Sequence, residues 1–191
     1  NKYTMQPTKE GKISVSVMCS DLMNLERDIK QLERNGVDYL HVDVMDAHFV
    51  PNLTFGVDFI AAMHRVTKLP LDIHLMVEHP LPIMEAMDIR PGDRISLHVE
   101  LGEQLHELAK AVRARGAHFG LVVNPSTPVE ALTPYLDEIE WVILMLVQPG
   151  FAGAKLIDGI LDKVAAARRF LDEHGHPETE ISVDGSVSCE R

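Results

Sequence analysis

The chain has 191 residues, of which 46% are hydrophobic and 25% are charged, so it is long enough for one sizeable core and is not expected to be disordered. Its formal net charge of −11, without a basic stripe, argues against a nucleic-acid partner. No apolar run is long enough to cross a bilayer, no signal-peptide pattern is present, and the cysteines, Cys19 and Cys189, form no disulfide framework, so we expect no membrane partner and a cytoplasmic location.

Residues 1–12 are polar and are expected to form an N-terminal tail, with residues 13–191 forming a single domain. Short strand-like runs alternate in this domain with segments of helical spacing, such as Leu105, Leu108 and Val112. Strand, helix and strand repeated along one chain predict parallel strands in an α/β fold. The expected strands are Ile13–Met18, Tyr39–Asp43, Leu71–Met76, Ile95–His98, Phe119–Asn124, Trp141–Met145 and Ile181–Asp184.

Five of these strands, all except Phe119–Asn124 and Trp141–Met145, alternate between one aliphatic face and one polar face. In the third, Ile73 and Leu75 alternate with His74 and Met76. An open doubly wound sheet would be apolar on both faces, whereas a closed barrel can bury the aliphatic face under helices and turn the other face inward. An antiparallel sandwich with a solvated face would show the same alternation, but the intervening helical segments disfavour it. The pattern therefore predicts a (β/α)8 TIM barrel.

A closed barrel needs eight strands, and the sequence contains seven candidates. Arg191 follows shortly after the seventh. We therefore expect this chain to be a barrel truncated after strand 7, with the eighth βα unit absent.

Polar side chains of one parity gather near the carboxyl ends of the expected strands. His41 and Asp43 lie two apart on one strand, His74 lies on the next, and Asp184 ends the seventh. Imidazole with carboxylate suits a divalent ion such as Zn²⁺, Fe²⁺, Mn²⁺ or Co²⁺. Any one of these residues alone would more simply be a hydrogen-bonded polar group, but four with the same parity favour a metal site.

Two further features allow two interpretations each. Inward-facing methionines on four strands either fill the core or form a water-poor, sulfur-lined wall over a reacting carbon. The loop at 148–153 lies between strand and helix and is either a simple turn or an anion site made by backbone N–H groups. The methionines are Met18, Met45, Met76 and Met145.

Five motifs together resemble the ribulose-phosphate 3-epimerase family, in order from about Ile13 to Ser186. A few side chains within them are more similar to the allulose-6-phosphate 3-epimerase branch. The five motifs are Ser14–Met18, His41–Asp46 with His48–Asn52, Asp72–Val77, Pro149–Gly153 and Val183–Gly185. The branch similarity rests on Ser16–Cys19, Gly150–Gly153 and Asp184–Ser186.

The resemblance implies a metal-dependent homo-oligomeric 3-epimerase of a ketose phosphate. The sugar pair would be D-allulose 6-phosphate/D-fructose 6-phosphate or D-ribulose 5-phosphate/D-xylulose 5-phosphate, interconverted through an ene-diolate. It also implies that His41, Asp43, His74 and Asp184 hold one divalent metal ion and that Asp43 and Asp184 are the acid/base pair. The implied substrate contacts are Ser16, Met45, His74, Met76, Met145, Gly150, Phe151, Ala152 and Gly153.

One departure from the family's residue pattern concerns the backbone, and two alternative functions remain open. Ala47 stands where the family usually has glycine, which we expect to be tolerated only if its φ is negative. A non-catalytic phosphosugar-binding barrel would not need two opposed carboxylates. A metal-dependent hydrolase or aldolase could use the same fold, although an aldolase usually needs a lysine at a strand end.

Overall fold

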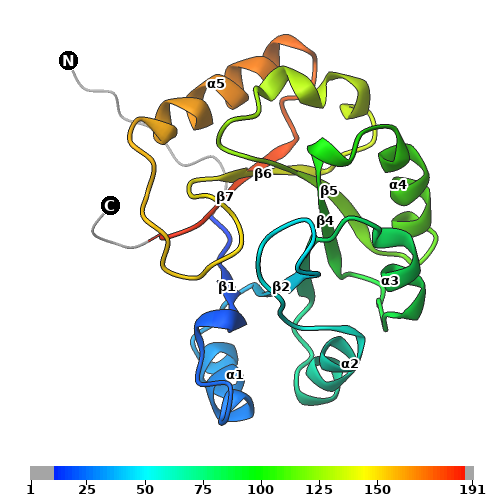
Figure 1. Ribbon diagram of the computed structural model, residues 1–191, viewed down its shortest axis with the longest axis vertical. Coiled ribbons are helices and arrows are strands. Elements are labelled where there is room, and N and C mark those ends of the chain that lie inside the picture. Colours follow the sequence, from blue (N-terminus) through cyan, green and yellow to red (C-terminus); the bar gives the residue numbers. More distant parts are fainter. Residues whose placement is uncertain (1–10, 188–191) are drawn as a thin grey trace.

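The structure, a computed structural model, describes residues 11–187 of the chain. Its seven strands form one entirely parallel sheet in which the order in space is the order in sequence (Figure 1). Most of the expected tail at 1–12, and Cys189, lie outside the described residues. The strands are β1 (Ser14–Ser16), β2 (Tyr39–Met45), β3 (Leu71–Met76), β4 (Arg94–His98), β5 (His118–Val123), β6 (Trp141–Met145) and β7 (Glu180–Asp184).

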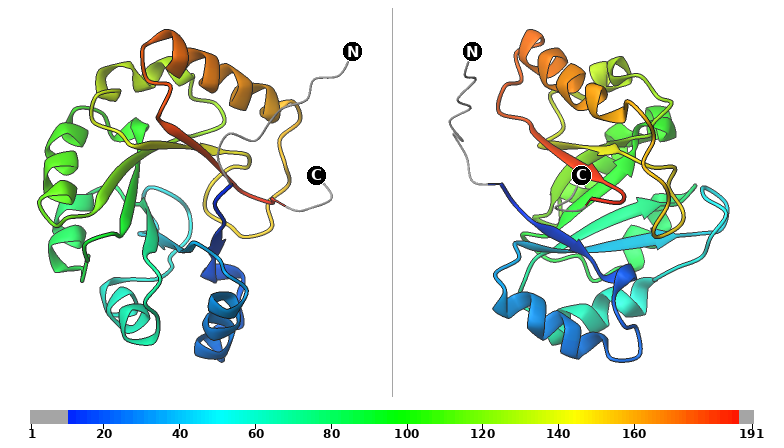
Figure 2. Two further views of the ribbon diagram at one scale, coloured as in Figure 1. Left: turned by 180° about the vertical axis from the view of Figure 1, so that it is seen from behind. Right: turned by 90° about the vertical axis from the view of Figure 1, so that its left-hand side faces the viewer.

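Helices lie on the outer side of this curled sheet, as Figures 1 and 2 show. Between α5 and α1 no helix of residues 11–187 covers the sheet. None of the described helices has both the length and the apolar character that a membrane crossing requires. The α-helices are α1 (Leu25–Arg34), α2 (Val57–Val66), α3 (Pro80–Ala86), α4 (Leu105–Arg113) and α5 (Ile160–Glu173), and the 3₁₀ segments are η1 (Val17–Cys19), η2 (Val99–Gln104) and η3 (Val129–Tyr135).

Local sequence explains where these helices begin and end. The first turn of α1 carries two acidic residues, which favour the positive end of the helix dipole. The helix α3 begins with Pro80, whose missing N–H costs nothing at that position. Gly36 after α1 and Gly175 after α5 have φ values of 74° and 82°, so the chain leaves each helix through a left-handed residue.

The two faces of the strands behave as the alternation predicts. Val42, Ile73, Leu97, Leu121 and Leu144 point outward and are fully buried in the main core beneath the helices. Each fully buried aliphatic side chain of this kind contributes about 1.5–3 kcal/mol relative to an exposed one. The inner face carries polar, methionine and aromatic side chains, with the aliphatic Val122 and Ile143 beside Trp141, and the placement of the polar groups positions the site.

The start of the sheet differs from the expected strand Ile13–Met18. Pairing with β2 ends at Ser16, and Val17–Cys19 forms a 3₁₀ turn. Ser16 and Met18 still line the same cavity, so their shared alternation could not reveal the turn.

The expectation for Ala47 is wrong. Its φ is 61°, in the left-handed region, although its side chain has no hydrogen-bonding group to compensate. The backbone N–H of Ala47 donates to the Asn52 carbonyl oxygen at 2.9 Å, and this hydrogen bond closes the loop after β2.

The seven parallel strands agree with a TIM-barrel-like α/β fold. In the described residues β1 and β7 are the two edges of the sheet. Lys12 beside β1 forms an ion pair of 2.5 Å with Glu180 of β7, so the curl of the sheet brings the edges within reach of one long side chain. The eighth unit stays a prediction.

Candidate functional site

Four polar side chains meet inside the sheet near the carboxyl ends of three strands. His41 and Asp43 come from β2, His74 from β3 and Asp184 from the end of β7. One ligand atom from each lies within 4.8 Å of all the others. Asp43 is paired with His74 in the parallel register of β2 and β3, and the curl of the sheet brings in Asp184 from the far edge.

Both histidines direct a ring nitrogen at the same two carboxylates. His41 Nε2 lies 3.2 Å from Asp43 Oδ1 and 3.5 Å from Asp184 Oδ2. His74 Nδ1 lies 3.4 Å and 3.5 Å from the same two oxygen atoms. His74 Nδ1 is buried and forms no hydrogen bond of good geometry, so it remains free for another partner. Two nitrogens and two carboxylate oxygens in this arrangement fit a divalent transition-metal ion.

Without such an ion, protons on the histidines balance the carboxylates. Burial opposes charge on His41, but Asp43, Asp72 and Asp184 outweigh it and raise its pKa well above its usual range. The pKa of His74 is raised in the same way by Asp184 and Asp43. Burial would raise the pKa of Asp43 and Asp184, but the two histidines lower both well below the ordinary value. A metal ion would therefore have to displace these protons.

His41 is held by a carboxylate behind it. Its Nδ1 lies 3.1 Å from Asp72 Oδ2, which also accepts a 2.8 Å hydrogen bond from Ser14 Oγ. The pair fixes the ring so that Nε2 faces the cluster, the arrangement that is typical of metal-binding histidines. Asp72 and Ser14 were not predicted as site residues, although both share the inward parity of His41.

His74 is held by a second buried histidine. Its Nε2 lies 2.8 Å from His98 Nε2, and His98 Nδ1 lies 3.3 Å from Glu100 Oε2. Burial lowers the pKa of His98 to about 4. Burial alone would raise the pKa of Glu100, but hydrogen bonds from His98 and Thr127 lower it to about 2. His98 and Glu100 were not predicted as site residues, although His98 has the inward parity of its strand.

A cavity of about 90 Å³ opens beside the cluster and contains both aspartates in its lining. Met45 and Met76 pack against each other with Val50 and Phe49, and Met145 approaches from β6. Ser16 donates a 2.9 Å hydrogen bond to Asp43 Oδ2. The inward methionines therefore lie at the cavity, and the wall they form has no exchangeable protons.

The loop 148–153 forms the outer wall of the same cavity. Gly150 and Gly153 have φ values of 121° and 72°, which favour glycine. Asn52 Nδ2 donates a 2.7 Å hydrogen bond to the Gly150 carbonyl oxygen, which ties this loop to the loop after β2. Phe151 is 57% exposed. The residues described along this cavity include no lysine or arginine, so an anion here would depend on backbone N–H groups.

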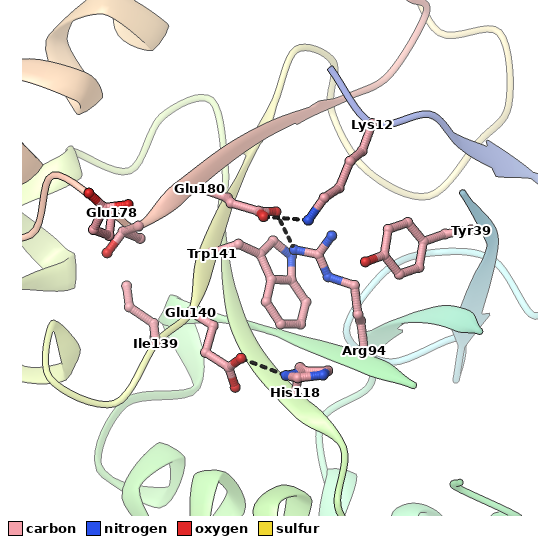
Figure 3. A pocket seen from close by; sticks show the side chains of 10 residues that line it. Lys12, Tyr39, Arg94, His118, Ile139, Glu140, Trp141, Glu178 and Glu180 are labelled. Atoms are coloured by element: carbon pink, nitrogen blue, oxygen red, sulfur yellow. Dashed lines mark hydrogen bonds and ion pairs between the residues drawn. The ribbon is translucent and has the colours of Figure 1, made fainter. Parts of the chain in front are cut away.

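A larger pocket, of about 490 Å³, lies at the opposite ends of the strands (Figure 3). Most of its charges are paired within it, because Glu180 pairs with Lys12 and Arg94 and His118 pairs with Glu140. The smaller cavity is the better candidate site, since it holds the converging ligands and the carboxyl ends of the strands, where enzymes with barrel folds place their chemistry.

Comparison with known proteins identifies the group to which this arrangement belongs. The sequence profile of the ribulose-phosphate 3 epimerase family matches residues 12–191. The ribulose-phosphate 3-epimerase of Bacillus subtilis is 40% identical over 94% of this chain and 82% of its own length. The enzyme of the same name from Treponema pallidum is 39% identical over 93% and 81%. The cytoplasmic isoform from Oryza sativa is 35% identical over 96% and 80%.

These matches include every strand that contributes to the cluster of His41, Asp43, His74 and Asp184. The chain therefore belongs to the ribulose-phosphate 3-epimerase family and is an epimerase, which makes it an isomerase that acts on a phosphorylated sugar.

Proposed function

We propose that this chain interconverts D-ribulose 5-phosphate and D-xylulose 5-phosphate by inverting the configuration at C3. Asp43 and Asp184 would carry the protons. The observation that supports this most directly is the placement of two carboxylates, from β2 and β7, in one cavity against the same two histidines. The names of the relatives favour the pentulose phosphate over allulose 6-phosphate.

Inversion requires a proton to leave one face of C3 and another to arrive at the opposite face. One aspartate must then be ionised while the other is protonated. Asp43 is the more fixed of the two, because its side chain is 11% exposed and receives a hydrogen bond from Ser16. Asp184 has a side chain that is 26% exposed and can adjust to the substrate.

The charge that develops on the substrate also needs stabilisation. We propose that His41, Asp43, His74 and Asp184 hold one divalent ion; Zn²⁺, Fe²⁺, Mn²⁺ and Co²⁺ all suit this donor set. Such an ion would supply Lewis-acid stabilisation of the negative charge on the ene-diolate oxygens.

The remaining contacts follow from the cavity. Met45, Met76 and Met145 would exclude water and leave the aspartates as the proton carriers at C3. The backbone from Gly150 through Phe151 and Ala152 to Gly153 would bind the phosphate. We propose further that the barrel is completed by an eighth βα unit, that residues 13–191 are one domain, and that the protein is a cytoplasmic homo-oligomer.

The test is exchange at C3 in deuterated water. Metal-loaded protein is given ribulose 5-phosphate or allulose 6-phosphate, and deuterium at C3 and the new epimer are followed by NMR. We expect exchange with ribulose 5-phosphate, and a loss of about 10²–10⁴-fold in Asp43→Asn and Asp184→Asn. The control Asp137→Asn changes a carboxylate that is 98% exposed and should leave the rate unchanged.

Two results would contradict the proposal. Faster exchange with allulose 6-phosphate would make the hexulose phosphate the substrate. No exchange with either sugar, in folded protein with bound metal, would exclude both reactions.

A further inference from the structure

We infer that His98 and Glu100 are positioning residues that fix His74 in the one tautomer able to bind a metal ion. The inference rests on the proposed function only in taking His74 as a metal ligand. It concerns the chain His74, His98, Glu100 and Thr127, called here the β4 relay, which runs from the site to the loop after β5.

The relay permits one arrangement of protons when His74 binds a metal. A ligating Nδ1 must carry a lone pair, so the proton of a neutral His74 lies on Nε2. That atom is 2.8 Å from His98 Nε2, which must therefore accept the hydrogen bond. The proton of His98 then lies on Nδ1, which is 3.3 Å from Glu100 Oε2, an ion-pair distance without the geometry of a good hydrogen bond in this structure. A carboxylate at the end of the relay is the partner that this arrangement requires.

The far end of the relay is built to keep Glu100 in place. Glu100 Oε1 accepts hydrogen bonds from Thr127 Oγ1 at 2.5 Å and from the backbone N–H of Asn124 at 3.2 Å. Lys163 of α5 donates in turn to the carbonyl oxygens of Asn124 and Thr127, at 2.6 Å and 2.5 Å. The loop that holds Glu100 is thus anchored by a helix on the outside of the sheet.

The two imidazoles are also shielded from competing partners. His74 and His98 are each 0% exposed. Their ring centroids are 5.0 Å apart, and Phe49 covers His98 with a centroid distance of 4.8 Å. No water can replace His98 as the acceptor without displacing these side chains, so loss of the His98 ring should leave the His74 tautomer undetermined.

The test measures metal binding and tautomer, both independent of catalysis. The apparent dissociation constant for Zn²⁺ is measured by competition with a fluorescent chelator in the wild type, His98→Leu, His98→Gln and Glu100→Gln. We expect about 10–100-fold weaker binding for His98→Leu, as is typical for loss of a residue behind a metal ligand. His98→Gln should recover most of this loss, because its amide oxygen can accept the proton of His74 Nε2.

Ser96→Ala is the matched control, because Ser96 lies on the same strand, is fully buried and has an unpartnered Oγ. It should bind Zn²⁺ as the wild type does. Glu100 is exposed, so the Glu100→Gln variant should fold even if the His98 variants do not. We expect Glu100→Gln to weaken Zn²⁺ binding measurably. Long-range ¹H–¹⁵N spectra of the Zn²⁺-loaded wild type should show His74 protonated on Nε2 and His98 on Nδ1.

The inference is wrong if folded His98→Leu and Glu100→Gln bind Zn²⁺ with wild-type affinity, or if the spectra place the His74 proton on Nδ1. A protein that binds Zn²⁺ as predicted but shows no exchange at C3 would contradict the proposed function and leave the relay intact.

Discussion

His41 and His74 present different nitrogens to one cluster, and their neighbours explain why. His41 faces the cluster with Nε2 because Asp72 holds Nδ1, whereas His74 faces it with Nδ1 because His98 occupies Nε2. Each histidine therefore depends on a residue of the adjacent strand. The residue behind each histidine therefore determines which ring nitrogen faces the cluster.

Ala47 is strained at the same scale. A non-glycine residue at φ 61° costs about 1–2 kcal/mol of strain in the folded protein. Glycine removes this strain, but it also raises the conformational entropy of the unfolded chain, which offsets part of the gain. Ala47→Gly should therefore raise the free energy of unfolding by about 0.5–1 kcal/mol, measured by urea denaturation. Ala114→Gly is the control: Ala114 is exposed with φ −60°, and the change should destabilise by up to about 1 kcal/mol. A destabilised Ala47→Gly variant would show that the strain is absent.

At the scale of elements, the amino ends of the strands are filled by a stack of aromatic and charged groups. The guanidinium of Arg94 lies 4.0 Å from the centre of the Trp141 ring and 4.8 Å from that of Tyr39, and it pairs with Glu180 at 3.1 Å (Figure 3). Trp141 can lie flat across β5 only because its register partner is Gly120. This layer closes the inner core beneath the site.

A side chain at Gly120 should disrupt that layer. A Cβ there would lie 2.4 Å from Trp141 Cε2, which forces the indole to move. We expect Gly120→Ala to lower the free energy of unfolding by about 1–3 kcal/mol. Trp141 is the only tryptophan in the chain, so its emission should shift to the red as it gains solvent.

Gly11→Ala is the control, because a Cβ at Gly11 meets nothing within 4 Å and Gly11 lies outside every helix and strand. It should leave both the stability and the emission close to those of the wild type. An unchanged Gly120→Ala variant would mean that the indole does not pack on β5.

At the scale of the whole molecule, the site connects distant parts of the sheet. Its ligands come from β2 and β3 near one edge and from β7 at the other. A bound ion would thus link the two edges that are unpaired in the described residues. Its contribution to folding should be visible in the thermal stability of the intact chain.

Metal removal should lower the melting temperature, and more at pH 8 than at pH 6. At free metal about 100-fold above the dissociation constant, binding adds about 2.7 kcal/mol, or roughly 5–10 °C for a chain of this size. The pKa values of His41 and His74 are raised from 6.5 in the metal-free fold. Their ion pairs therefore stabilise that fold fully below pH 6.5 and fade as the pH rises through the raised values.

The measurement is scanning calorimetry with and without a chelator at both pH values. The same protons compete with the metal, so the difference between the two scans should grow with pH. A difference that shrinks towards pH 8 would contradict the raised histidine pKa values.

Much of the fold follows from local patterns. Alternation in each strand is a local property, and it placed all seven strands within one or two residues of their observed bounds. The first strand ends two residues earlier than expected, because Val17–Cys19 forms a 3₁₀ turn. Parity also brought out His41, Asp43, His74 and Asp184, since a parallel sheet aligns the carboxyl ends of its strands.

The tertiary structure decided what depends on contacts between strands. Sequence spacing could not show that His98 lies 2.8 Å from His74, that Asp72 holds His41, or that Gly120 makes room for Trp141. Each of these depends on register and curl, which arise from packing across the whole sheet. The sequence by itself determined which side chains face inward, and the tertiary structure decided which of them touch, because side-chain direction is a local property and distance is not.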